Sequence, residues 1–134
     1  MPQRRTAPAI CTLTLILLPL SGCSGILAPC AGHASSPEAS LKAFLTAAHE
    51  NNASSAQLAL QPGYTVDAEA FDRLHETLAD STVADLRLSL SDRMSVVYFY
   101  RVLDASGAFL GQFEVQQLET GCFATAWGHW RDPE

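Results

Sequence analysis

The sequence predicts an α+β domain in which N-terminal helices pack on one face of a four-stranded antiparallel β-meander. Apolar residues recur at helical spacing through residues 36–78, whereas from Ser81 onward they alternate with polar residues as in strands with one wet face. Short polar turns separate the alternating segments, which favours antiparallel hairpins. Helices with one apolar stripe and a sheet with one apolar face bury these surfaces against each other.

Three helices are expected before the sheet. The first begins at Pro37 with Ser36 as its N-cap, and Asn51 and Asn52 mark its exit. Its apolar stripe follows the spacing i, i+3, i+4, i+7 and consists of Leu41, Phe44, Leu45 and Ala48. A short second helix is expected over residues 55–60, and Asp67 is the expected cap of a third.

Four strands are expected over residues 84–90, 94–103, 109–118 and 122–130. Residues 91–93 are the expected first turn. The second strand is expected to be central because both of its faces are apolar. In the third, Phe109, Phe113 and Val115 are expected to share one face.

The first 22 residues have the layout of a secretory signal, with Arg4 and Arg5 followed by an apolar stretch and then by small residues. The apolar stretch has about 14 residues, whereas a membrane-spanning helix needs roughly 20. We therefore expect an export signal that is removed rather than a permanent transmembrane helix.

The end of this segment, Leu20-Ser21-Gly22-Cys23, resembles the lipobox of bacterial lipoproteins. The resemblance implies that the Cys23 thiol receives a diacylglyceryl group and that Cys23 becomes the new N-terminus. The expected organisation is a signal peptide at 1–22, a tether at 23–35 and a domain at 36–131, held on the outer side of the cell membrane by lipid. An ordinary signal with a chance cysteine is the alternative.

Charge narrows the range of partners. The chain has a formal net charge of −6, and removal of the two signal arginines would change it to −8. Such a surface repels phosphate backbones and anionic lipid headgroups, so we expect no nucleic-acid partner, and we expect acyl chains rather than a basic patch to hold the protein to the membrane. The expected partners are the membrane, through Cys23, and an unknown small ligand or envelope protein; no motif indicates a cofactor.

Two cysteines, Cys30 and Cys122, remain after removal of Cys11 with the signal and lipidation of Cys23. In an oxidising compartment they can form a disulfide that closes a loop of roughly 90 residues. The alternative is a buried Cys122 beside an unpaired Cys30. No metal site is expected, because neither cysteine has further ligands at short spacing.

The order of elements is similar to the nuclear transport factor 2-like superfamily. The similarity covers about residues 36–131 and rests on the opening segment 36–45 and on the final run 121–127. It implies a curved sheet that wraps a long helix and leaves a pocket, which some members use for isomerisation or cyclisation. No motif carries catalytic positions over to this chain, so no catalytic residue is assigned.

Two groups of side chains are candidates for a functional site. The pocket candidates are Tyr98, Tyr100, Trp127 and His129, for which core packing is the alternative. On the third helix, Asp72, His75 and Glu76 share a face and could bind a metal or exchange protons, but a solvated helix face is the favoured reading.

Three functions are compatible with these features. The first is a lipid-anchored domain that binds a ligand or partner without catalysis. The second is an isomerase-like or cyclase-like enzyme that uses a pocket carboxylate or histidine. The third is a structural interaction module of the cell envelope. Convergence of titratable groups in one cavity would favour the enzyme.

Overall fold

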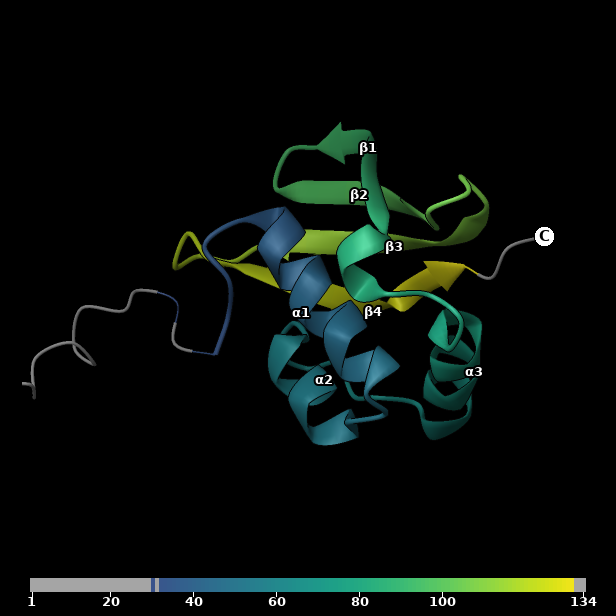
Figure 1. Cartoon of the computed structure of the whole chain (residues 1–134). Helices are drawn as coiled ribbons and strands as arrows, with labels where there is room; N and C mark the ends of the chain where they lie inside the picture. Colours follow the sequence, from purple (N-terminus) through teal and green to yellow (C-terminus); the bar gives the residue numbers. More distant parts are fainter. Residues whose placement is uncertain (1–29, 31, 132–134) are drawn as a thin grey trace, which may run out of the picture.

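The computed structural model describes residue 30 and residues 32–131, with the backbone alone for 127–131 (Figure 1). Three helices precede a four-stranded sheet, which confirms the α+β class. Helix α1 lies between the sheet and the other two helices and contacts β3, β4, α2 and α3. The helices are α1 (Pro37–His49), α2 (Ala53–Ala59) and α3 (Ala68–Leu78), and a 3₁₀ turn, η1 (Val83–Asp85), leads into the sheet.

Local capping explains where the helices begin. The Ser36 side chain accepts a hydrogen bond from the Ala39 amide at 3.2 Å, with Pro37 at the first helical position, as the sequence predicts. Asn52 caps α2, which therefore begins two residues earlier than expected. Helix α1 ends where Asn51 adopts a positive φ of 53°, a conformation that asparagine tolerates better than most residues.

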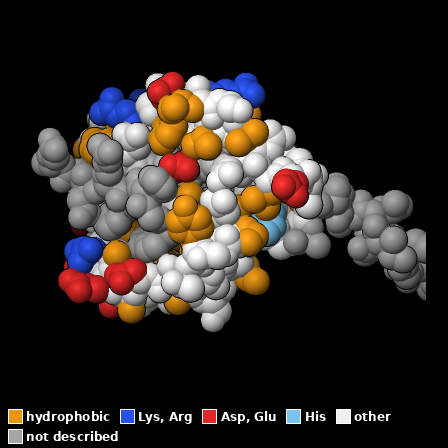
Figure 2. Space-filling model, turned by 180° about the vertical axis from the view of Figure 1, so that it is seen from behind, with side chains coloured by type: hydrophobic (Ala, Val, Ile, Leu, Met, Phe, Trp, Pro, Cys, Tyr) orange, Lys and Arg blue, Asp and Glu red, His pale blue; other side chains and the backbone are white. Residues whose placement is uncertain are grey.

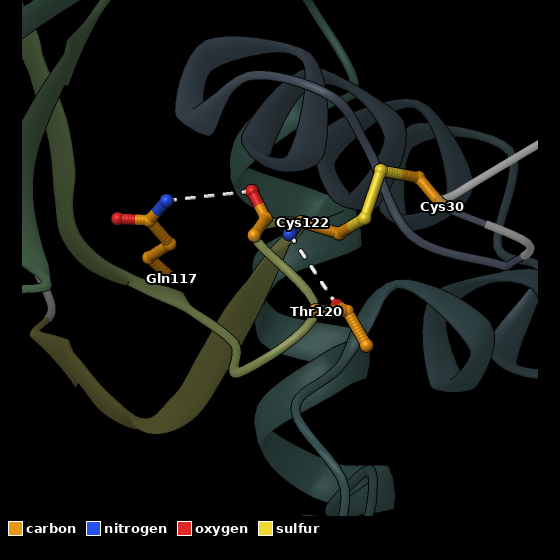
Figure 3. The surroundings of a disulfide bond; sticks show 5 residues. Cys30, Gln117, Thr120 and Cys122 are labelled. Atoms are coloured by element: carbon orange, nitrogen blue, oxygen red, sulfur yellow. Dashed lines mark hydrogen bonds between the residues drawn. A yellow bond between two sulfur atoms is a disulfide. The ribbon is translucent and has the colours of Figure 1, made fainter.

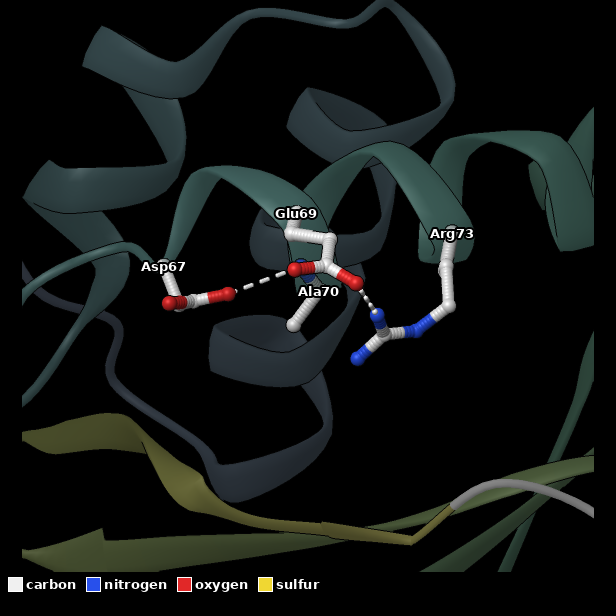
Figure 4. Close-up of polar contacts among 4 residues, drawn as sticks. All are labelled: Asp67, Glu69, Ala70 and Arg73. Carbon is white, nitrogen blue, oxygen red and sulfur yellow. Dashed lines mark hydrogen bonds and ion pairs between the residues drawn. The ribbon is translucent and has the colours of Figure 1, made fainter.

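The start of α3 is stabilised by two polar contacts (Figure 4). The Asp67 carboxylate accepts from the Ala70 amide at 2.8 Å, and Arg73 pairs with Glu69 one turn away at 2.9 Å. The exposed ion pair adds little stability, because both side chains are largely in water. The cap confirms the role expected for Asp67.

The strands form an antiparallel meander in the order β1-β2-β3-β4, which confirms the expected topology. β2 lies between β1 and β3, so its expected central position is also confirmed. The strands are β1 (Arg87–Met94), β2 (Val97–Leu103), β3 (Phe109–Gln117) and β4 (Phe123–Arg131).

The first hairpin differs from the sequence-based expectation. The strand expected over 84–90 begins later and runs on to Met94, and the turn lies at Ser95 and Val96 instead of at residues 91–93. A bulge between Leu90 and Asp92 lets pairing with β2 continue past the polar residues. Polar side chains are compatible with pairing here because β1 is an exposed edge strand.

The alternation predicted that Phe109 shares a face with Phe113 and Val115. In the structure it does not. A register shift between Val102 and Leu103 offsets the start of β3. The Phe109 ring lies 5.0 Å beneath the Arg101 guanidinium carbon, and Arg101 is on the opposite side of β2 from buried Val102. A bulge thus reverses the face that Phe109 would have in a regular strand.

The hydrophobic core lies between α1 and the sheet. The predicted α1 stripe of Leu41, Phe44, Leu45 and Ala48 is completely buried. The Phe44 and Phe113 rings lie with centroids 6.2 Å apart in a tilted contact, and both are at most 1% exposed. Large side chains therefore fill the space between the central helix and β3.

Candidate functional site

The two predicted pocket tyrosines have different environments. Both lie on the helix-facing side of β2, with Tyr100 paired to Phe113 and Tyr98 paired to Val115. Tyr100 is 2% exposed and belongs to the core. Tyr98 is half-buried, with its ring edge-on to Phe123 at 5.6 Å. Core packing, the alternative considered for these residues, describes Tyr100.

The remaining predicted residues lie outside what the structure describes. Trp127 and His129 belong to β4, but their side chains are outside the described set. Cys23 also lies outside the described residues. The pocket assignment of Trp127 and His129 and the lipidation of Cys23 therefore stay predictions.

Charge near Tyr100 comes from the start of α1. Burial raises the pKa of the Tyr100 phenol above its ordinary value, and the Glu38 carboxylate and then Tyr98 raise it further. The phenol is therefore neutral at physiological pH. Glu38 itself is exposed, so a negative charge lies at the solvent side of this tyrosine.

A cleft of about 170 Å³ opens between the first turns of α1 and the beginning of β1. Glu38 and Lys42, one helical turn apart, supply opposite charges on one wall, and Leu86 and Leu88 supply an apolar wall. We call these four residues the α1–β1 cleft. It can hold a small group with an apolar body and a polar end.

A larger hollow of about 260 Å³ lies at the end of the sheet beside the β2–β3 turn. Asp80, Asp85 and Asp104 contribute to its wall. The Asp104 carboxylate accepts from the Ser106 amide and hydroxyl and from the Ala108 amide, at 2.6–2.9 Å. The Ser106 hydroxyl and then the Ala108 amide lower the pKa of Asp104. Its charge is used to stabilise the turn.

The described end of the segment expected to be a tether, Cys30 and residues 32–35, is attached to the domain at several points (Figure 3). The sulfur atoms of Cys30 and Cys122 lie at bonding distance, 2.02 Å, with a sequence separation of 92. Ala34 exchanges two backbone hydrogen bonds with Phe123, and His33 Nε2 donates to the Leu60 carbonyl at 3.3 Å. The chain from Cys30 onward is thus tied to the beginning of β4.

Another cavity lies against the attached segment, at residues 32–34. It measures about 160 Å³ and is lined by Gly32, His33, Ala34, Ser40, Ala43 and Ala59. The Ser40 hydroxyl is used in a buried contact with Thr125. Small side chains on both sides of the contact leave this gap between the attached segment and the helices.

The polar trio on α3 does not form a common site. Asp72 and Glu76 are exposed, whereas half-buried His75 donates from Nδ1 to the Ala48 carbonyl at 3.0 Å. His75 therefore contacts the C-terminal part of α1, about 15 Å from Glu38 at 1.5 Å per residue. It joins α3 to the end of α1, where the Ala48 carbonyl also accepts from the Asn51 backbone amide at 3.1 Å.

Sequence reasoning did not identify the α1–β1 cleft. The available signals were the opposite charges of Glu38 and Lys42 at a spacing of four and the alternating Leu86 and Leu88. Neither signal states that the start of α1 faces β1, because that relationship depends on contacts between distant segments. The cleft is a surface feature beside a filled core.

Among the described side chains, those of residue 30 and residues 32–126, no three histidine, cysteine or acidic groups lie close enough together to hold a metal ion. None of the helices in this part of the chain has the length and apolar character needed to cross a bilayer. No protein-family model, curated protein or solved structure matches the chain.

Proposed function

We propose that this chain is a membrane-anchored bacterial lipoprotein whose domain binds a ligand or an envelope partner without catalysing a reaction. The lipobox-like Leu20-Ser21-Gly22-Cys23 supports the anchor. The bonding distance between Cys30 and Cys122 supports an oxidising compartment, where disulfides persist. The location that follows is the outer side of the cell membrane.

A nuclear transport factor 2-like fold is part of this proposal. The order of helices and strands and the position of α1 against the helix-facing side of the sheet support it. In that superfamily the space between helix and sheet is the usual pocket. Here Phe44, Leu41 and Phe113 fill the space under α1, so recognition is left to the surface.

The filled space between α1 and β3 is the observation that carries the non-catalytic function. Sites for drug-sized molecules measure about 300–1,000 Å³. The α1–β1 cleft is smaller, at about 170 Å³, and fits one side chain or a group of similar size. A partner protein that inserts one amphipathic side chain between the Glu38–Lys42 wall and the leucine wall suits this shape better than an enclosed small molecule.

The isomerase or cyclase alternative has less support. Among the described residues, His75 contacts one end of α1 while Glu38 and Tyr100 lie near the other. An acid–base pair needs its groups within hydrogen-bond reach of one substrate. A purely structural envelope module is also an alternative, and the cross-linking experiment below separates it from a cleft-dependent binder.

The anchor is tested by growing cells with labelled fatty acid. Cys23→Ser should abolish incorporation and leave the signal uncleaved, whereas Cys11→Ser, a matched change in the same segment, should label normally. Equal labelling of both variants would contradict the anchor.

The binding site is tested by photo-cross-linking in cells. A benzophenone amino acid at Lys42 should give a discrete adduct that disappears when Leu88→Arg fills the cleft. The same probe at exposed Leu58 on α2 is the control. Identical adducts from both positions, or an adduct at Lys42 that survives Leu88→Arg, would contradict recognition at the α1–β1 cleft.

A further inference from the structure

The tip of the β1–β2 hairpin exposes apolar side chains beside an arginine. Met94 is 63% exposed and Val96 is 41% exposed, among the large hydrophobic residues most open to solvent in the described chain. Arg93 precedes them and is also exposed. We call Arg93, Met94 and Val96 the hairpin tip. Leu90, half exposed, continues the apolar character along β1.

The hairpin tip lies at the end of the sheet where the chain enters the domain. In an antiparallel meander the β1–β2 and β3–β4 turns are at the same end. The Gln117 backbone amide donates to the Val96 carbonyl at 2.8 Å, and this bond joins the tip to the last residue of β3. Five residues later Cys122 is bonded to Cys30. Figure 1 shows the first described residues and both turns at the left end of the sheet.

The distance to the anchor is short. Cys30 lies seven positions after Cys23, a distance along the chain that spans at most about 25 Å when extended and roughly 15 Å as a flexible chain. The disulfide fixes the far end of this segment beside the β3–β4 turn. If Cys23 carries the lipid, the hairpin tip is held within reach of the bilayer surface.

Charge is distributed unevenly over the domain. The hairpin, residues 87–103, contains three of the chain's eight basic residues and only one of its fourteen acids. Those charges are Arg87, Arg93, Arg101 and Asp92. Asp92 lies next to the tip and accepts a hydrogen bond from the Arg93 amide at 2.7 Å, and exposed Glu119 lies on the neighbouring β3–β4 turn.

The hairpin as a whole is therefore basic and apolar in an acidic protein. Arg93 is its arginine at the tip, because Arg87 pairs with Leu103 at the other end and Arg101 lies further along β2. Figure 2 shows hydrophobic and basic side chains, with an acidic one among them, along the upper edge of the rear view. Anionic lipid headgroups attract arginine, and apolar side chains at the same surface can enter the boundary between headgroups and acyl chains.

Arg93 is also positioned for this role. Its guanidinium carbon lies 4.8 Å from the Tyr98 ring centroid, and its Nε donates to the Ser95 carbonyl at 3.3 Å. These contacts hold the charge at the turn, which reduces the rotamer entropy that headgroup binding would otherwise cost. Ser95 adopts a positive φ of 55° in the turn that presents Met94 and Val96.

From these observations we infer that the hairpin tip docks on an anionic phospholipid bilayer and fixes the orientation of the domain on the membrane. The inference rests on the proposed lipid anchor at Cys23 for its proximity to the bilayer. The anchor alone would let the domain rotate about its tether. With the tip as a second contact, the α1–β1 cleft is presented in one direction.

The test uses the full chain produced in bacteria, extracted and placed in lipid vesicles. A benzophenone amino acid replaces Met94 in one protein and Leu58, of similar exposure but on α2, in a matched control. After irradiation, mass spectrometry detects covalent lipid adducts. We expect adducts from the Met94 position in vesicles of equal parts phosphatidylcholine and phosphatidylglycerol, few in phosphatidylcholine alone, and none from Leu58.

Charge reversal tests the role of arginine. Arg93→Glu should strongly reduce the yield from the Met94 position, whereas Arg73→Glu, on α3, should leave it unchanged. Circular dichroism of each variant checks that the fold is retained. Absence of lipid adducts, equal yields from both probe positions, or a protein–protein adduct at twice the chain mass would overturn the inference.

Failure of the anchor can be distinguished from failure of this contact. The intact mass of the same preparation shows whether Cys23 carries lipid. An unmodified Cys23 would contradict the proposed anchoring, and the adduct yield from Met94 would still decide whether the hairpin tip contacts the bilayer. A lipidated Cys23 without Met94 adducts would leave the anchor intact and reject the hairpin contact.

Discussion

The hydroxyl oxygens of Ser40 and Thr125 lie 3.2 Å apart in the interface between α1 and β4, and both residues are at most 2% exposed. They join segments that are 85 residues apart in the sequence. The Thr125 backbone carbonyl also accepts from the Gln61 backbone amide at 2.9 Å. Thr125 thus links β4 to both α1 and the segment that follows α2.

The hydroxyl pair can be tested by a double-mutant cycle. Ser40→Ala should lower the free energy of unfolding by about 1–3 kcal/mol, because it leaves the buried Thr125 hydroxyl without this partner. Ser40→Ala with Thr125→Val should cost less than the sum of the two single changes. Urea unfolding measures each value, with Ser54→Ala on exposed α2 as the control. Additive effects would contradict direct coupling.

The disulfide should contribute a large part of the stability. The bond closes a loop with a sequence separation of 92. On the chain-entropy account, the entropy that the unfolded chain loses raises the free energy of unfolding by about 4–5 kcal/mol. The variant Cys30→Ala with Cys122→Ala should therefore unfold at lower urea, and reductant should shift the wild-type protein but not the variant. Alkylation of both thiols in protein that was never reduced would show that the bond does not form.

The contact between Phe44 and Phe113 should dominate the core. Phe44→Ala removes a ring that is fully buried against the sheet and should cost about 3–5 kcal/mol. Leu58→Ala removes an apolar side chain that is 68% exposed and should change stability by no more than about 0.5 kcal/mol. Thermal unfolding compares the two variants. Similar losses from both would argue against the packing of α1 on β3.

Tyr100 should make the free energy of unfolding fall at alkaline pH. Because burial first, and then the charges of Glu38 and Tyr98, raise the folded-state pKa above 10.0, the folded protein holds the phenol proton more tightly than the unfolded chain. The resulting stability is fully present below pH 10.0 and is lost as pH rises through the folded-state pKa.

The matched variant for this prediction is Tyr100→Phe, which keeps the ring and removes the titrating group. It should flatten the fall in unfolding free energy above about pH 10. Urea unfolding at increasing alkaline pH measures the slope. An unchanged slope in Tyr100→Phe would assign this fall to another group.

Features that depend on neighbours in sequence were predictable. The beginning of α1 follows from the Ser36 side chain and Pro37, which act within one turn, and its buried face follows from the spacing of four apolar residues. The meander follows from short turns between alternating segments. These features need no information about distant residues.

Features that depend on the pairing of strands could not be predicted from the sequence. The polar residues 91–93 are compatible with a turn or with an exposed edge strand, and the bulge after Leu90 decides between them. The same reason applies to Phe109, whose face changes at a register shift. Alternation along one strand does not record where its partner is offset.

The candidate site divides in the same way. The sequence grouped Tyr98 with Tyr100, and they do share a face, but only packing beneath α1 makes Tyr100 a core residue and leaves Tyr98 half-buried. The α1–β1 cleft joins residues more than forty positions apart. Its existence depends on where α1 rests on the sheet.

The sequence by itself determined the helix boundaries set by Ser36 and Asp67, the α+β class, and the prediction that Cys23 anchors the chain, because each follows from local spacing. Tertiary structure decided that the space between α1 and β3 is filled, that the α1–β1 cleft opens beside it, and that the hairpin tip lies at the same end as Cys30. These relations arise from side-chain volume and strand register, which act between distant segments and leave no local pattern.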